Sequence, residues 1–95
     1  MKSLGLVEVS GVVAAVDALD LMCKSSNVEF VTWERKLGGR LVTIIVSGNV
    51  SDVTEAVECV KRSAAVPPCA SYVIANPHEE TMRMVELSAS RIKKK

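Results

Sequence analysis

Two β-rich runs separated by a short glycine-containing segment constrain the fold of this chain most. The runs are residues 28–33 and 41–46, and both are rich in β-branched or aromatic side chains. Such runs, joined by a few residues that include Gly, predict a β-hairpin. The joining segment contains two adjacent glycines, which allow a tight turn, and it carries three cations: Arg35, Lys36 and Arg40.

The rest of the chain predicts the element order β-α-β-β-α-β-α. That order is the split βαβ pattern of a ferredoxin-like α+β fold. It predicts a four-stranded antiparallel sheet with the helices packed on one face. A helix from Asn49 or Ser51 would stop before Pro67, with Val53, Ala56, Val57, Val60 and Ala64 as its apolar stripe. The other expected elements are strands at residues 4–10 and 70–75 and helices at 12–25 and 79–90, the last with Met82, Val85 and Leu87 as its apolar residues.

Length and composition predict one domain over residues 1–95, with a core at about 4–87 and a basic tail at 91–95. A chain of 95 residues buries only a modest core. Hydrophobic residues make up 48% of the chain but aromatic residues only 3%. So much small apolar surface in a short chain predicts that part of it is buried against partner subunits.

The charge balance argues against nucleic acid and membrane partners. The net charge is +1, from 12 basic and 11 acidic residues, so no global field attracts polyanions. The N-terminus runs straight into a strand-like stretch, so we expect no signal sequence, and no apolar stretch approaches the roughly 20 residues that span a bilayer. The three cysteines, Cys23, Cys59 and Cys69, form no CxxC pair, which predicts reduced, partly buried thiols in a cytosolic protein.

The sequence offers no catalytic or metal-binding constellation. Its one histidine, His78, has no Ser or Cys neighbour, and nucleophilic catalysis needs a nucleophile beside a base. One histidine with scattered cysteines does not match a metal site, and no cofactor motif is present. The residues alone predict a small, non-catalytic, self-associating domain. A regulatory domain that binds an anion at hairpin residues 36–40 remains an alternative, with a small hydrolase as a weaker one.

Five stretches, in order, resemble the single-domain, hexamer-forming shell proteins of bacterial microcompartments. Residues 4–8 are similar to the family's LGxxE start, and residues 11–24 resemble its first helix, which ends in an interface lysine. Three further likenesses are residues 36–43 to its K-I-G-G/S-G-L-x-T pore segment, 46–50 to its V-x-G-D/N-V turn, and 74–78 to its I-P-R-P-H exit.

This resemblance implies the BMC fold and a structural shell subunit without catalytic residues, metal or cofactor. Such subunits form cyclic hexamers that tile into a sheet enclosing enzymes, with a central pore for small metabolites. The implied partners are copies of itself, other shell proteins and encapsulated enzymes. The implied pore-lining residues are Lys36, Leu37, Gly38, Gly39 and Arg40, and the implied hexamer-edge residues are Lys24, Asn76, Pro77 and His78.

Two departures from the family pattern bear on assembly. Asn76 stands where the family has an edge arginine, whose planar, multi-donor contacts an amide cannot reproduce. Arg40 stands at the third glycine of the pore motif. The alternative to a regularly tiling hexamer is therefore an atypical shell component that oligomerises without regular tiling.

Overall fold

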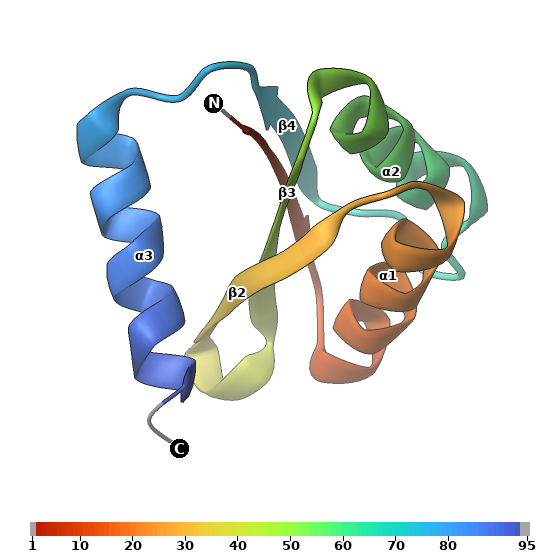
Figure 1. Ribbon diagram of the computed structural model, residues 1–95. Helices are drawn as coiled ribbons and strands as arrows, with labels where there is room; N and C mark the ends of the chain where they lie inside the picture. Colours follow the sequence, from red (N-terminus) through yellow and green to blue (C-terminus); the bar gives the residue numbers. More distant parts are fainter. Residues whose placement is uncertain (1, 94–95) are drawn as a thin grey trace.

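The computed structural model describes residues 2–93, and it contains one sheet and three α-helices (Figure 1). The sheet has the strand order β2-β3-β1-β4, and every neighbouring pair is antiparallel. Because β3 lies between β1 and β2, this is the predicted split βαβ arrangement. In chain order the elements are β1 Ser3–Val9, α1 Val12–Ser25, β2 Glu29–Lys36, the 3-10 turn η1 Leu37–Gly39, β3 Leu41–Gly48, α2 Val50–Ser63, β4 Ala70–Ile74 and α3 Glu79–Lys93.

The main core lies between the sheet and the pair α1 and α2 (Figure 1). β1 and β3 present alternate residues to these helices, as the period of two in a strand requires. The two helices pack small apolar side chains against the sheet, so they approach it closely. The fully buried members of this cluster include Val7, Val9, Ala15, Ala18, Met22, Val42, Ile44, Val46, Ala56 and Val60.

The prediction that all helices pack on one face is wrong, because α3 lies on the opposite face of the sheet (Figure 1). The physical reason is that the central strands are apolar on both sides. Leu4 of β1 and Ile45 of β3 point away from α1 and α2, and they are buried with Val85 of α3. A sheet with two apolar faces needs a cover on each.

Several element boundaries differ from the predictions. β2 continues through Glu34 to Lys36, so the first three residues of the expected loop are strand. α3 is three residues longer than expected and includes the first three residues of the predicted tail, while residues 94 and 95 lie outside the described part. Leu87, one of the three apolar residues named for this helix, is 48% exposed, whereas Ser88 is buried.

The N-cap and the apolar stripe of α2 were predicted correctly from the sequence. Asn49 caps the helix, and its side-chain oxygen accepts a hydrogen bond from the Asp52 backbone N–H at 2.9 Å. This satisfies one of the backbone donors left free at a helix start. The predicted stripe on α2 is confirmed, with Val53, Ala56, Val57 and Val60 buried and Ala64 partly buried.

Candidate functional site

The β2–β3 hairpin closes through a short turn with unusual backbone geometry. Lys36 pairs with Leu41, so only four residues connect the two strands. Leu37, Gly38 and Gly39 all have positive φ, at 55°, 66° and 92°. Glycine adopts this region at little cost, but Leu37 does so at roughly 1–2 kcal/mol. The Arg40 N–H donates to the Leu37 carbonyl at 3.3 Å and closes the turn.

The start of α1 holds this turn in place. The Gly11 N–H donates to the carbonyl of Arg40 at 3.0 Å. A Cβ on Gly39 would lie 3.1 Å from a methyl group of Val12, so turn and helix are in close approach. Gly11 has φ 101° and ψ 151°, a conformation that is essentially restricted to glycine. The hairpin tip is therefore tied to the body of the domain by main-chain contact.

Three exposed cations surround the turn: Arg35, Lys36 and Arg40. None of them takes part in an ion pair with another residue in the described range 2–93. The nearest acid in sequence, Glu34, instead accepts a hydrogen bond from Ser88 on α3. The five predicted pore residues thus lie together at one end of the sheet, where positive charge is concentrated.

A hydroxyl network joins α3 to β2 directly behind the hairpin. The Ser88 hydroxyl lies 2.8 Å from that of Thr32, which is fully buried, and it also bonds Glu34. Ser88 was not predicted from the sequence. Helical spacing could have identified it as a buried position. Residues 82, 85, 88, 89 and 92 lie on one face of a helix, and all are buried or partly buried.

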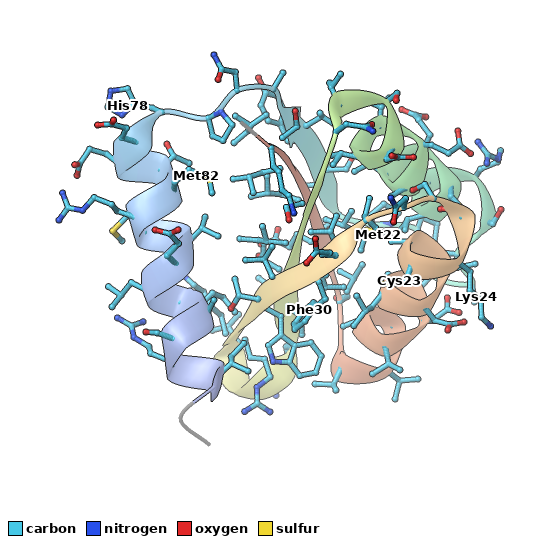
Figure 2. The ribbon with its side chains drawn as sticks, in the orientation of Figure 1. Met22, Cys23, Lys24, Phe30, His78 and Met82 are labelled. Carbon is cyan, nitrogen blue, oxygen red and sulfur yellow. The ribbon has the colours of Figure 1, made fainter. Side chains whose placement is uncertain are left out.

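The predicted edge residues divide between two sides of the molecule. Figure 2 shows Lys24 on the outer side of α1 and His78 at the start of α3, far from it. Lys24 is exposed, and its Nζ lies 2.8 Å from Asp20 Oδ2 on the preceding turn. This hydrogen bond, with the carboxylate charge, raises the pKa of Lys24 above its ordinary value of 10.5. One subunit therefore does not bring the edge residues together.

The exit from β4 is fixed by local backbone interactions. Asn76 has φ 55°, a left-handed conformation that Asn tolerates better than most residues. Pro77 is buried, which leaves the exposed Asn76 and His78 available for surface contacts. His78 Nδ1 accepts a hydrogen bond from the Glu80 N–H at 3.1 Å, so its ring orients the first turn of α3.

The cysteines differ from the prediction in their exposure. All three are free thiols, but Cys23 and Cys69 are exposed and only Cys59 is buried. Within residues 2–93, no group of three or more His, Cys, Asp or Glu side chains could hold a metal ion. No helix in that range is long and apolar enough to cross a lipid bilayer.

The fold and the glycine-rich cationic hairpin agree with a known family. The chain belongs to the BMC domain family of bacterial microcompartment shell proteins, and the match covers residues 3–77. It is 37% identical over 92 residues to the bacterial microcompartment shell protein PduA of Salmonella typhimurium, covering 95% of this chain and 97% of that protein. It is 40% identical over 81 residues to the carboxysome shell protein CcmK1 of Thermosynechococcus vestitus, covering 81% of this chain and 71% of that protein.

A solved structure supports the same assignment. A microcompartments protein from Desulfitobacterium hafniense DCB superimposes with a TM-score of 0.78 at 25% sequence identity. The match covers 93% of this chain but only 48% of that chain, so the domain described here spans about half of its length. The resemblance of the five sequence stretches to shell proteins is thereby confirmed.

Proposed function

We propose that this protein is a structural subunit of a bacterial microcompartment shell and forms cyclic hexamers around the β2–β3 hairpin. The observation that carries the proposal is the turn itself. It projects from one end of the domain, is held by the Gly11–Arg40 main-chain bond, and presents cations without partners among the described residues. A subunit of this kind acts by assembling, and no catalytic step is assigned to it.

Exposed apolar side chains beside the turn support ring formation. Val13 is 86% exposed and Val16 is 55% exposed on one face of α1, and Leu37 at the tip is 70% exposed. Val12 touches the hairpin at Gly39, so the start of α1 and the tip form one surface. Neighbouring apolar groups at such exposure favour burial against a second copy of the chain. The turn would then repeat around the ring axis and line a small pore.

The charge of the turn suggests which solutes the pore favours. Six copies of Lys36 and Arg40 near one axis would create a positive potential in a narrow opening. Small anionic metabolites would enter more readily than neutral ones of the same size. Comparing entry of an anionic and a neutral solute into shells that contain wild-type protein or Arg40→Ala would test this. Equal selectivity in the two shells would contradict it.

The edge contacts decide whether the rings tile. Lys24 is exposed on α1, while His78 lies on the other side of the subunit (Figure 2), and Asn76 is exposed two residues before it. Asn76 offers fewer donors than the arginine expected there, so weaker tiling is the specific alternative.

Light scattering should give about six times the subunit mass of 10.2 kDa. Electron microscopy should then separate extended sheets from isolated rings, and a monomer would overturn the proposal.

Assembly with other shell proteins and with enclosed enzymes forms part of the same proposal. It rests on relatives that are named as shell and carboxysome proteins. Co-purification from cells that express the whole compartment would test it. The result expected is that the protein is found in the shell fraction. Recovery only as a free soluble ring would contradict a shell location.

A further inference from the structure

The face of the sheet that carries α3 is only partly covered by that helix, which packs mainly over β2. Leu4 of β1 is buried with α3, so Leu6 and Glu8 lie on the same face, because alternate residues of a strand share a face. Tyr72 of the edge strand β4 pairs with Leu6 and is 68% exposed. Leu6, Glu8 and Tyr72 thus form an open face of the sheet. A hollow of about 370 Å³ lies over it, and its lining is Leu6, Glu8, Thr43, Ala70, Ser71 and Tyr72.

Glu8 is the charged group of the open face. It is half-buried, and its carboxylate accepts one long hydrogen bond, at 3.5 Å from the Thr43 hydroxyl. No cation pairs with it among residues 2–93. A carboxylate in partly apolar surroundings is stabilised by a cation that donates hydrogen bonds to it. The exposed Tyr72 ring favours the same kind of group, because a cation is attracted to an aromatic face. The open face therefore suits a partner that presents a cation among apolar side chains.

The opposite edge of the molecule carries such an arrangement. The strand order β2-β3-β1-β4 makes β2 and β4 the two edges of the sheet. Arg35 of β2 pairs with Val42, which is buried under α1 and α2, so the register places the Arg35 side chain on that face. Arg35 is exposed and has no ion pair in the part of the chain that the structure describes. The exposed Val13 and Val16 belong to α1, which covers the same face.

Glu8 and Arg35 lie at the same level of the sheet, because they pair with consecutive residues of β3. In a ring whose axis passes near the hairpin turn, rotation keeps each residue at a constant distance from the axis. Groups that meet between neighbouring copies therefore lie at similar distances from the turn. The other two cations of the hairpin fit less well, since Lys36 points to the α3 face and Arg40 lies in the turn itself.

We propose that the Glu8 carboxylate of one copy binds the Arg35 guanidinium of the next copy, with apolar residues of α1 from that copy covering Leu6 and Tyr72. This contact rests on the proposed ring, which it would close. The two surfaces are different patches of one chain, so the contact is head-to-tail, the type that forms rings when the rotation closes. A guanidinium can bind a carboxylate through two parallel hydrogen bonds, so the pair also sets the orientation of neighbouring copies.

Charge reversal separates this contact from the ring itself. In the full chain, Glu8→Arg and Arg35→Glu should each raise the protein concentration for half-assembly at least tenfold in light scattering, because like charges then meet. Circular dichroism should stay unchanged. The double variant should assemble again. An equimolar mixture of the two single variants should also assemble, since alternating copies bring opposite charges together at every contact. If Glu8→Arg does not fold, Glu8→Gln should still weaken assembly and reduce its salt dependence.

Two controls test whether the effect is specific to this pair. Glu86→Arg reverses an exposed acid on α3, outside the hollow, and should assemble as the wild type does. Lys36→Glu combined with Glu8→Arg should stay dissociated, and its recovery would overturn the choice of Arg35. If the wild type assembles but the single variants assemble equally well, or if neither the double variant nor the mixture recovers, the contact is overturned while the ring stands. A monomeric wild type would overturn the ring and the contact together.

Discussion

The hydroxyl oxygens of Thr32 and Ser88 lie 2.8 Å apart, although 56 positions separate them in the sequence. Both residues are buried, and the Ser88 hydroxyl also bonds Glu34. This is the polar link between α3 and the edge strand that carries the hairpin. It holds the C-terminal half of α3 against β2. The whole of this helix lies beyond the family match, which ends at residue 77.

We expect Ser88→Ala to destabilise the domain by about 1–2 kcal/mol, because the buried Thr32 hydroxyl would keep only its longer, 3.5 Å bond to the Trp33 carbonyl. Urea unfolding at fixed protein concentration measures this. Ser90→Ala is the matched control, since Ser90 is exposed and bonds only the Leu87 carbonyl of its own helix. If both variants lose the same stability, the buried link contributes nothing specific.

Gly11→Ala should cost roughly 1–3 kcal/mol, although no atom lies within 4 Å of the added methyl group. The cost comes from the backbone, because φ 101° with ψ 151° is unfavourable for any residue with a Cβ. Thermal unfolding should show a lower midpoint than in Ser10→Ala, the adjacent exposed control. An unchanged midpoint would mean that the helix start relaxes to another conformation.

Gly5→Ala tests close packing instead of backbone strain. A Cβ at this position would lie 2.8 Å from a methyl group of Val53 on α2, so the helix would have to shift. Overpacking of this kind costs about 1–3 kcal/mol. The penalty should shrink in the Val53→Ala background, which removes the clashing methyl group. A double-mutant cycle in urea measures the coupling, and strictly additive losses would contradict the clash.

Val13→Glu should prevent assembly without unfolding the subunit. Val13 is 86% exposed beside the turn, so a charge there costs nothing in the monomer but would be buried in the proposed ring. Light scattering should show a smaller particle with an unchanged circular dichroism spectrum. Val66→Glu, at a position 45% exposed in the loop after α2, is the control and should still assemble. Rings formed by Val13→Glu would place the interface elsewhere.

Asp20→Asn should lower the pKa of Lys24 toward 10.5, because the hydrogen bond and the carboxylate charge that raise it are weakened. A raised pKa means that the pair stabilises the folded state below pH 10.5 and that this contribution disappears as the pH rises through the folded-state pKa. The group is fully exposed, so the effect is small. NMR titration of the Lys24 side chain measures it. Asp17→Asn, which alters an acceptor of the Ala65 N–H instead, should leave the titration unchanged.

The sequence could predict those parts of the fold that depend on neighbouring residues. The hairpin was predicted from two β-rich runs around Gly38 and Gly39, and the cap at Asn49 from its place before an apolar stripe. The antiparallel four-stranded sheet followed from the order of elements. The strand ends were less accurate, because Arg35 and Lys36 have no strong strand preference and pair only because the partner strand β3 continues beside them.

The position of α3 could not be predicted in the same way. Its side of the sheet depends on Leu4 and Ile45, whose outward orientation follows from the register of β1 with β3. Leu87 was named for this helix by its apolar residue type alone, but the helical spacing of the buried face places Ser88 there instead.

The bond that ties the turn to α1 uses main-chain atoms on both sides, the N–H of Gly11 and the carbonyl of Arg40. The side chain at position 40 therefore takes no part in holding the turn, and its φ of −73° suits any ordinary residue. Position 40 can vary in evolution, or in a designed library, without loss of the scaffold beneath it. If the turn lines a pore as proposed, the side chain that would set solute preference can change without altering the backbone contact that holds the loop.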